Sequence, residues 1–232
     1  MEYYKYDLHV HTAQSSLCAR SKGASLVDKY AAAGYSGFVT TDHFIGSPNC
    51  SSNEERSWKD KVYKFASGYY DALNRGIQCG FDVFFGFEFF YDNTEFVVLN
   101  LTPEKLILLG EQIISDNLAG ALQTFRDSGG FIIHVHPFRY RNREHTTRLL
   151  PELTDAVEIF NGENIFLWPD ANELARKYAK EIGKPPVSGS DLHGDSELIT
   201  GGMMFPKKIC TPEELVHEIR FGHGNLIMNA LF

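Results

Sequence analysis

Short apolar segments alternate with helical segments along most of the chain, and this alternation restricts the fold more than any other feature. Near-continuous apolar runs typical of buried strands occur at residues 3–10, 36–43, 82–90, 131–137, 155–162 and 185–193. Strands of this kind, joined by helices, are typical of a mostly parallel sheet. The sequence therefore predicts the α/β class. About seven strand–helix units in 232 residues suit a small closed barrel.

Local signals refine this pattern. Residues 25–35 predict a helix that begins at an N-cap Ser25 and ends at Gly34. Residues 94–101 predict a strand that runs antiparallel to the strand before it. The chain shows no linker, low-complexity stretch or internal repeat, so residues 1–232 are predicted to form a single domain.

Composition excludes several classes of protein. With 43% apolar residues the chain can bury a large core, whereas its net charge of −8 argues against a nucleic-acid partner, which favours a basic face. The four cysteines are far apart and form no CxxC pair, which favours reduced thiols and a cytoplasmic location. The N-terminal residues lack the pattern of a signal peptide, and no apolar run is long enough to span a membrane.

Two histidines stand one residue apart in the stretch DLHVHTAQSS. His9 and His11 follow an apolar strand and precede a polar turn. Because residues i and i+2 of a strand point to the same face, both imidazoles are expected to approach one point. Two converging ring nitrogens suit a metal ion better than an apolar core, although a solvated strand end is the alternative.

The other predicted strands end in similar residues. Of the nine histidines, six lie at or near strand ends, and carboxylates accompany them. These strands carry Asp42-His43, Glu88, His134-Val135-His136 and Asp191-Leu192-His193. Because the carboxyl ends of parallel strands gather at one face of a barrel, these side chains are expected to be neighbours. Neutral imidazoles and ionised carboxylates together are good ligands for zinc, manganese or iron.

Six short motifs in this order resemble those of the PHP family, named for polymerase and histidinol phosphatase. The motifs are DLHVHT, TTDH, GFE, HVHPFR, VEIFNG and GSDLH, and the match extends from about residue 6 to residue 205. The resemblance implies a distorted (β/α)7 barrel of the PHP type. It also implies a metal-dependent phosphoesterase with divalent metal ions as cofactors, one to three in number and drawn from zinc, manganese and iron.

The resemblance further implies a role for each motif residue. A first metal site would contain His9, His11, Glu88 and Asp191. Glu88 would bridge to a second metal held by His136, and a third metal would be held by His43 and His193. A carboxylate that binds metal ions also avoids the cost of burying an unpaired charge among apolar residues.

Two positions depart from the family pattern. The family motif carries an aspartate where this chain has Ser16, and a serine hydroxyl is a weaker ligand than a carboxylate. The family also often has a histidine in the strand that here reads EFVVLN around Val97. Glu95 is the nearest acid, and its role as a ligand stays open. His134 is expected in the core or beside the ligands, with direct ligation as the alternative. Because two positions depart from the family pattern, the binding of fewer than three metal ions also stays open.

These features together predict hydrolysis of a small phosphomonoester by metal-activated water. His193 is the candidate proton donor to the leaving alcohol. Arg139 is the candidate phosphate-binding cation, with an exposed arginine as the alternative. Two other functions stay open. A PHP-like module with weakened metal sites would bind a ligand or partner without turnover, and a related barrel hydrolase would act on C–N bonds.

Overall fold

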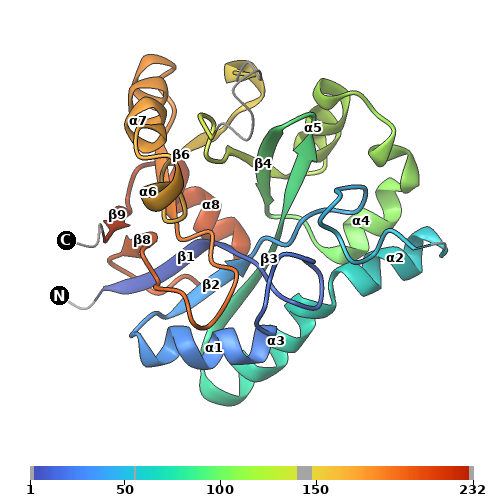
Figure 1. The fold of residues 1–232 in the computed structure, drawn as a ribbon, viewed down its shortest axis with the longest axis horizontal. Helices are drawn as coiled ribbons and strands as arrows, with labels where there is room; N and C mark the ends of the chain where they lie inside the picture. Colours follow the sequence, from blue (N-terminus) through green and yellow to red (C-terminus); the bar gives the residue numbers. More distant parts are fainter. Residues whose placement is uncertain (1–2, 55, 140–147, 230–232) are drawn as a thin grey trace.

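The computed structural model describes residues 3–54, 56–139 and 148–229, and its strands form one sheet (Figure 1) with the order β7-β6-β5-β4-β3-β2-β1-β8-β9. The strands are β1 (Tyr4–Val10), β2 (Gly37–Thr40), β3 (Asp82–Tyr91), β4 (Thr94–Leu99), β5 (Phe131–His134), β6 (Ala156–Asn161), β7 (Pro186–Gly189), β8 (Gly201–Phe205) and β9 (Asn225–Met228). The α-helices are α1 (Gly23–Ala32), α2 (Trp58–Phe65), α3 (Ser67–Cys79), α4 (Pro103–Leu109), α5 (Leu118–Asp127), α6 (Asn164–Leu167), α7 (Ala171–Glu181) and α8 (Pro212–Arg220), with short 3₁₀ turns η1 (Glu111–Ile114) and η2 (Pro151–Leu153). Among these described helices, none has both the length and the apolar character needed to cross a membrane.

Strands β1 to β7 form a nearly closed barrel. The pairs β1–β2, β2–β3, β5–β6 and β6–β7 are parallel, whereas β4 runs antiparallel to both β3 and β5. The barrel closes where Leu192, just after β7, bridges in parallel to Val10 at the end of β1. Across this seam the backbone N–H of His11 donates to the Leu192 carbonyl at 2.9 Å. The predicted distorted α/β barrel is therefore confirmed, and the reversed direction of β4 is its main distortion.

A two-residue turn reverses the chain between β3 and β4. Asp92 (φ 45°) and Asn93 (φ 62°) both adopt left-handed backbone conformations. Positive φ at both central residues is the mark of a type I′ turn, whose twist matches that of paired strands and which favours Asn and Asp. The predicted antiparallel neighbour of β3 is confirmed by this hairpin.

The predicted N-cap at Ser25 is wrong, because α1 begins at Gly23. The backbone N–H of Gly23 donates to the Gln14 side chain at 3.2 Å, and the next N–H donates to the Asp71 carboxylate at 2.9 Å. Side chains distant in sequence thus satisfy the free donors that a local cap would satisfy. The predicted helix end is confirmed, because Gly34 (φ 75°) adopts the left-handed conformation typical of a helix terminus.

Strand β8 was not expected from the sequence. It pairs antiparallel with β1 and in turn carries β9. Its sequence GGMMF begins with two glycines, which have weak strand propensity. A Cβ at Gly201 would lie 2.3 Å from the backbone of Gly189 in β7, so the close approach of two strands requires glycine here.

Alternation along β3 sets the direction of its acidic side chain. Phe87 and Phe89 pack against Phe125 of α5, with ring centroids 5.1 and 5.3 Å apart. Glu88 lies between them in sequence and therefore points to the opposite face of the strand. Both faces of β3 are buried, which explains the continuous apolar run DVFFGFEFF.

Candidate metal centre

Strands β1 and β3 and the segments that follow β1, β2, β5 and β7 bring the predicted ligands together. We call these residues the histidine–carboxylate cluster: His9, His11, His43, Glu88, His136, Asp191 and His193. All of them except His193 are at most 5% exposed. Side chains from widely separated parts of the chain are therefore neighbours in one buried site.

Glu88 lies at the centre of the cluster. Its Oε2 is 2.8 Å from Nδ1 of His43, and its Oε1 is 3.0 Å from Nε2 of His136 and 3.5 Å from Nε2 of His9. The two oxygens thus face imidazoles from three different segments. From this position one carboxylate can contact two metal ions.

Asp191 lies beside the two histidines of the opening motif. Its Oδ1 is 3.1 Å from Nε2 of His11 and 3.4 Å from Nε2 of His9. Asp191 (φ 55°) and His136 (φ 29°) both adopt backbone conformations that non-glycine residues rarely adopt. Such strain is concentrated at functional sites, where the surrounding structure holds side chains in fixed positions.

Hydrogen bonds fix the orientation of two of the imidazoles. Nδ1 of His9 donates to Oε1 of Glu158 at 2.9 Å, and Nδ1 of His193 donates to the backbone carbonyl of Asp191 at 3.0 Å. Because an ionised carboxylate and a carbonyl only accept hydrogen bonds, each Nδ1 carries a proton. Nε2 is then the nitrogen available to a metal ion, as is usual for histidine ligands held by a carboxylate or carbonyl.

Three ring nitrogens of the cluster are buried without a hydrogen-bond partner among the residues described. They are Nε2 of His9, Nε2 of His11 and Nδ1 of His43. Each lies within 4 Å of a Glu88 oxygen but lacks hydrogen-bond geometry. Buried polar atoms nearly always have a hydrogen-bond partner, so a ligand outside the chain is expected to contact these nitrogens. Nitrogen and carboxylate donors in this arrangement fit zinc, iron or manganese.

The electrostatics of the cluster favour a bound cation. Burial would raise the pKa of Glu88 and Asp191, but His43 beside Glu88, and His9 and Arg139 beside Asp191, hold both well below the usual range. Burial would lower the pKa of His9 and His43, but Asp191 and Glu88 respectively raise them. The carboxylates are therefore ionised and need positive charge close by. A metal ion can supply that charge and displace protons from the imidazoles.

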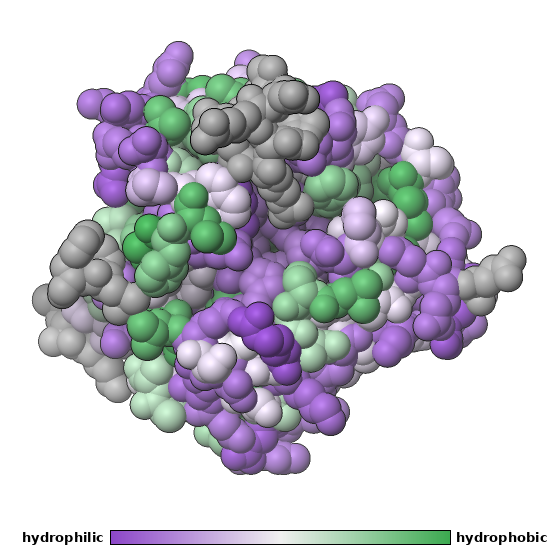
Figure 2. All heavy atoms as spheres, in the orientation of Figure 1, coloured by the Kyte–Doolittle hydropathy of each residue, from purple (hydrophilic) through white to green (hydrophobic). Residues whose placement is uncertain are grey.

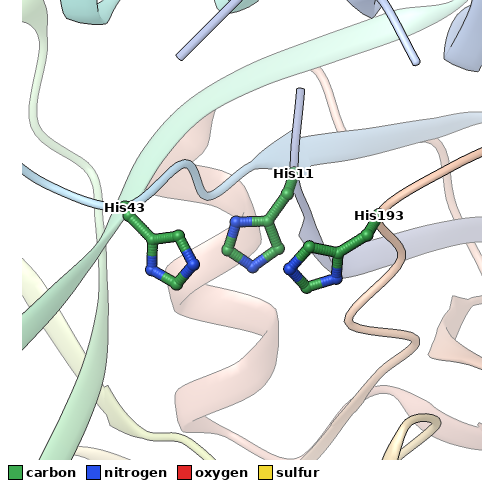
Figure 3. Close-up of side chains that lie close together, drawn as sticks. All are labelled: His11, His43 and His193. Atoms are coloured by element: carbon green, nitrogen blue, oxygen red, sulfur yellow. The ribbon is translucent and has the colours of Figure 1, made fainter. Parts of the chain in front are cut away.

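His11, His43 and His193 form a distinct group within the cluster (Figure 3). One ring nitrogen of each lies within 4.8 Å of the others. The ring of His11 lies between the other two, with its centroid 4.6 Å from that of His43 and 4.4 Å from that of His193. This group contains both residues that the family resemblance assigns to a third metal.

Ser16 stands in the place of the family's aspartate, but its hydroxyl is fully used. Oγ donates to Oδ1 of Asp42 at 2.6 Å, accepts from the backbone N–H of His43 at 3.1 Å and lies 3.3 Å from Nδ1 of His11. A hydroxyl has one proton and two acceptor positions, so none is left for a metal ion. The Asp42 carboxylate is also engaged, by the backbone N–H of Thr12 at 2.6 Å and its Oγ1 at 2.7 Å.

Arg139 reaches the cluster as a buried side chain, so the alternative of an exposed arginine is wrong. Its Nη1 lies 2.8 Å from Oδ2 of Asp191 and 3.0 Å from Oε2 of Glu163. Nη2 donates to Asn161 at 2.6 Å, and Nε donates to Asn164 at 3.0 Å. These partners engage all three guanidinium nitrogens, which favours a role in positioning Asp191 over direct phosphate binding.

His134 and His136 have different environments because β5 ends at His134. His134 is buried and stacks on Phe96 with centroids 4.6 Å apart, and its burial lowers its pKa to about 3. It therefore belongs to the core. His136 faces Glu88, and its Nδ1 lies 3.8 Å from Oε2 of Glu95. Glu95 also joins Glu88 in one of the groups that could hold a metal ion.

Glu158 is a residue of the site that the sequence patterns did not single out. One of its oxygens accepts from Nδ1 of His9, and the other accepts from the backbone N–H of His136 at 3.0 Å and from Asn161 at 2.9 Å. It thus joins two segments that carry predicted ligands. The sequence does contain a signal that could have identified Glu158: it is an acid within the apolar run VEIFNG, and a carboxylate inside a buried strand needs partners.

Two cavities that share part of their lining adjoin the cluster. The smaller is about 180 Å³ and the larger about 550 Å³, and Cys18, Glu163, Asp191 and His193 line both. Figure 2 shows hydrophilic surface in a hollow at the middle of the face in view. The exposed ring of Phe166 adds an apolar wall to the larger cavity. A small molecule can therefore lie beside the cluster.

Cys18 is a second residue that the sequence patterns missed. Burial would raise the pKa of its thiol, but interactions with His193 and His43 lower it to about 7. Spacing gave no sign of this contact, because the three residues are far apart in sequence.

A separate group of titratable residues lies on and just after α8. His217 and His223 flank the carboxylate of Glu218, with each Nδ1 3.1 Å from a carboxylate oxygen. Nζ of Lys207 lies 3.2 Å from the same carboxylate. Because the lysine already supplies positive charge there, this group is a weaker metal site than the buried cluster.

The fold and the cluster define a class of protein: an α/β barrel with buried histidines and carboxylates, able to hold metal ions, near its strand ends. A family model for the PHP-associated region matches residues 169–223. No curated protein matches the chain significantly. The family match is thus limited to this C-terminal segment, and the solved structures described next share the fold of the chain.

Several solved structures share this fold. A two-domain protein from Bacteroides vulgatus, which contains a predicted PHP-like metal-dependent phosphoesterase, has a TM-score of 0.74 and 14% identity over 98% of this chain and 65% of its own. An amidohydrolase from Chromobacterium violaceum, with bound sulfate and no metal, has a TM-score of 0.60 and 15% identity over 97% of this chain and 99% of its own. A lesion-specific endonuclease from Pyrococcus furiosus has a TM-score of 0.60 and 12% identity over 98% of this chain and 58% of its own. The chain thus spans less than two thirds of the first and third of these proteins, and hydrolases of different kinds share the fold.

Proposed function

We propose that this chain is a metal-dependent phosphoesterase that hydrolyses a small phosphomonoester. The observation that carries the proposal is the set of buried imidazole nitrogens that face Glu88 and Asp191 without hydrogen-bond partners among the residues described. Cations bound there would activate water and neutralise the charge of a phosphoryl group. A cytoplasmic location is part of the proposal and rests on the four free cysteines.

The proposed ligands are the members of the histidine–carboxylate cluster. The first ion is assigned to His9, His11, Glu88 and Asp191, the second to His136 with Glu88, and the third to His43 with His193. The ions are one to three in number and are zinc, manganese or iron. Supporting this assignment, Nδ1 of His9 and of His193 is occupied by a hydrogen bond, which leaves Nε2 as the donor atom.

Three residues of the chain have separate roles in the proposed reaction. Glu158 holds the ring of His9 so that Nε2 faces the carboxylates. Arg139 fixes the Asp191 carboxylate at 2.8 Å and adds positive charge beside the smaller cavity. His193 borders both cavities, and in a form without a third ion its Nε2 would carry the proton that passes to the leaving alcohol.

The cavities and the overall charge support a small substrate. A cavity of about 550 Å³ suits a small molecule. The net charge of −8 does not suit the phosphate backbone of a polymer, which basic side chains usually neutralise. Because an endonuclease shares the fold, nucleic acid is nevertheless included in the test.

Binding without turnover is the second candidate function, and one observation favours it. Ser16 replaces the family's aspartate and has no free acceptor position, so its contribution to the third site is lost. Hydrolysis of a C–N bond is a further arm of the test, because an amidohydrolase shares the fold.

The test uses protein stripped of metal by a chelator and reloaded with zinc, manganese or ferrous iron. We expect metal-stimulated hydrolysis of p-nitrophenyl phosphate, and lower or no activity on a phosphodiester, a short single-stranded oligonucleotide and an amide. Asp191→Asn should lose both bound metal and turnover, whereas the exposed Asp127→Asn serves as the matched control and should keep both. Metal binding without turnover on any substrate would favour the binding module. Failure to bind metal would refute the proposed centre.

A further inference from the structure

The third metal group lacks the acid that the family pattern supplies. His43 and His193 belong to this group, but the acidic position is occupied by Ser16. The Ser16 hydroxyl is saturated by Asp42, by the backbone N–H of His43 and by the ring of His11. Asp42 is itself bound by Thr12 through two hydrogen bonds. Neither of these side chains is available to complete the group.

Cys18 lies close to the two histidines of this group. Both His193 and His43 lower the pKa of its thiol, which places the thiol within interaction range of the two imidazoles. All three residues line the cavity of about 180 Å³, together with Glu88 and Asp191. A sulfur atom therefore borders the same cavity as the two imidazoles.

The backbone around Cys18 is fixed by its neighbours. The N–H of Leu17 donates to the carbonyl of Asn49 at 2.8 Å. The N–H of Arg20 donates to the carbonyl of His193 at 2.7 Å. The second bond joins the loop of Cys18 directly to the segment that carries His193. The thiol thus has a defined position relative to this histidine.

An independent feature indicates that this group binds an ion. His43 is 3% exposed, and its Nδ1 faces Oε2 of Glu88 at 2.8 Å, so its other nitrogen is the one on the side of His11 and His193 (Figure 3). Nε2 of His11, whose ring lies between those of His43 and His193, has no hydrogen-bond partner among the residues described. Nδ1 of His193 is bound to a carbonyl, which directs its other nitrogen to a ligand.

We propose that Cys18 is a metal ligand, and that its thiolate holds the third ion together with His43 and His193 in place of the missing aspartate. The thiol releases its proton to solvent when the metal–sulfur bond forms, so the thiolate contributes one negative charge, as the aspartate would. Thiolate and imidazole donors select zinc or ferrous iron over manganese or magnesium, and three protein ligands are typical of a catalytic zinc site. The inference rests on the proposed metal centre and adds both a ligand and a metal preference to it.

Cobalt(II) provides the direct test, because a thiolate bound to cobalt produces a charge-transfer absorption in the near ultraviolet. We expect this band in the full chain loaded to saturation and its complete loss in Cys18→Ser. Cys79→Ser and Cys210→Ser remove exposed thiols and should keep the band. In zinc titrations the weakest site of Cys18→Ser should lose at least about tenfold in affinity, and Cys18→Asp should restore zinc binding without the cobalt band.

A second measurement needs no substitution. Saturating zinc should protect Cys18 of the unmodified chain from iodoacetamide, while the exposed Cys79 stays reactive as an internal control. Equal alkylation of Cys18 with and without zinc would overturn the proposal, as would a cobalt band that survives Cys18→Ser. A chain that binds cobalt but shows no thiolate band would refute only the role of Cys18. A chain that binds no cobalt would refute the metal centre as a whole.

Discussion

Replacement of Glu158 by glutamine should weaken metal binding although Glu158 is not a proposed ligand. Its Oε1 accepts from Nδ1 of His9 at 2.9 Å, and its Oε2 accepts from the backbone N–H of His136 at 3.0 Å and from Asn161 at 2.9 Å. A glutamine has only one acceptor oxygen, so its amide group would place a donor against His9 or against His136. One buried donor would then be left unpaired.

The expected magnitude follows from this geometry. Loss of a group that orients a histidine ligand typically lowers metal affinity by about 10–100-fold, which corresponds to about 1.4–2.7 kcal/mol of binding free energy. An unpaired buried donor costs about 1–3 kcal/mol, so the metal-free protein should also lose stability by about that amount.

Competition titration with a chromophoric zinc chelator measures the affinity, and urea unfolding of the metal-free protein measures the free energy of unfolding. Glu181→Gln at the exposed end of α7 is the matched control and should leave both quantities unchanged. If Glu158→Gln bound zinc as tightly as the unsubstituted chain, the inference that Glu158 orients His9 would be wrong.

Three further outcomes are expected. His136→Phe should lose bound metal, whereas His134→Phe should keep it, because His134 stacks on Phe96 in the core; equal losses measured by elemental analysis would contradict the separate environments of these histidines. Gly189→Ala should lower the free energy of unfolding by about 1–3 kcal/mol and weaken metal binding, because the added Cβ would lie 2.5 Å from Cβ of His9. Gly120→Ala in α5 meets no atom closer than 3.5 Å and is its control; similar unfolding midpoints for the two would argue against the close contact. Zinc at about 100 times its dissociation constant should stabilise the chain by about 2.7 kcal/mol, and a melting temperature unchanged by chelator would contradict metal binding to the folded state.

The sequence predicted strands and helices most clearly where a segment was long and apolar. Strand β3, with its run DVFFGFEFF, was predicted because both of its faces are buried, and its hairpin to β4 follows from the Asp92-Asn93 turn. The start of α1 was misplaced because Gln14 and Asp71 satisfy its first N–H groups, and no local residue reports those contacts. Strand β8 was missed because glycines permit a close approach to β7, which local propensity cannot anticipate.

The predicted ligands owe their recognition to their place at strand ends, since the carboxyl ends of parallel strands meet at one face of a barrel. No such position in the sequence identifies Glu158 and Cys18, the other two residues of the site. Glu158 meets His9 across 149 positions of sequence, and Cys18 meets His193 only because the loop after β1 is bound to the segment after β7. Hydropathy patterns and short motifs report the local environment of a residue, and they therefore sufficed to predict the barrel and the clustering of the motif residues. Which side chain orients, saturates or replaces a ligand depends on contacts between distant segments, and these arise only when the barrel closes.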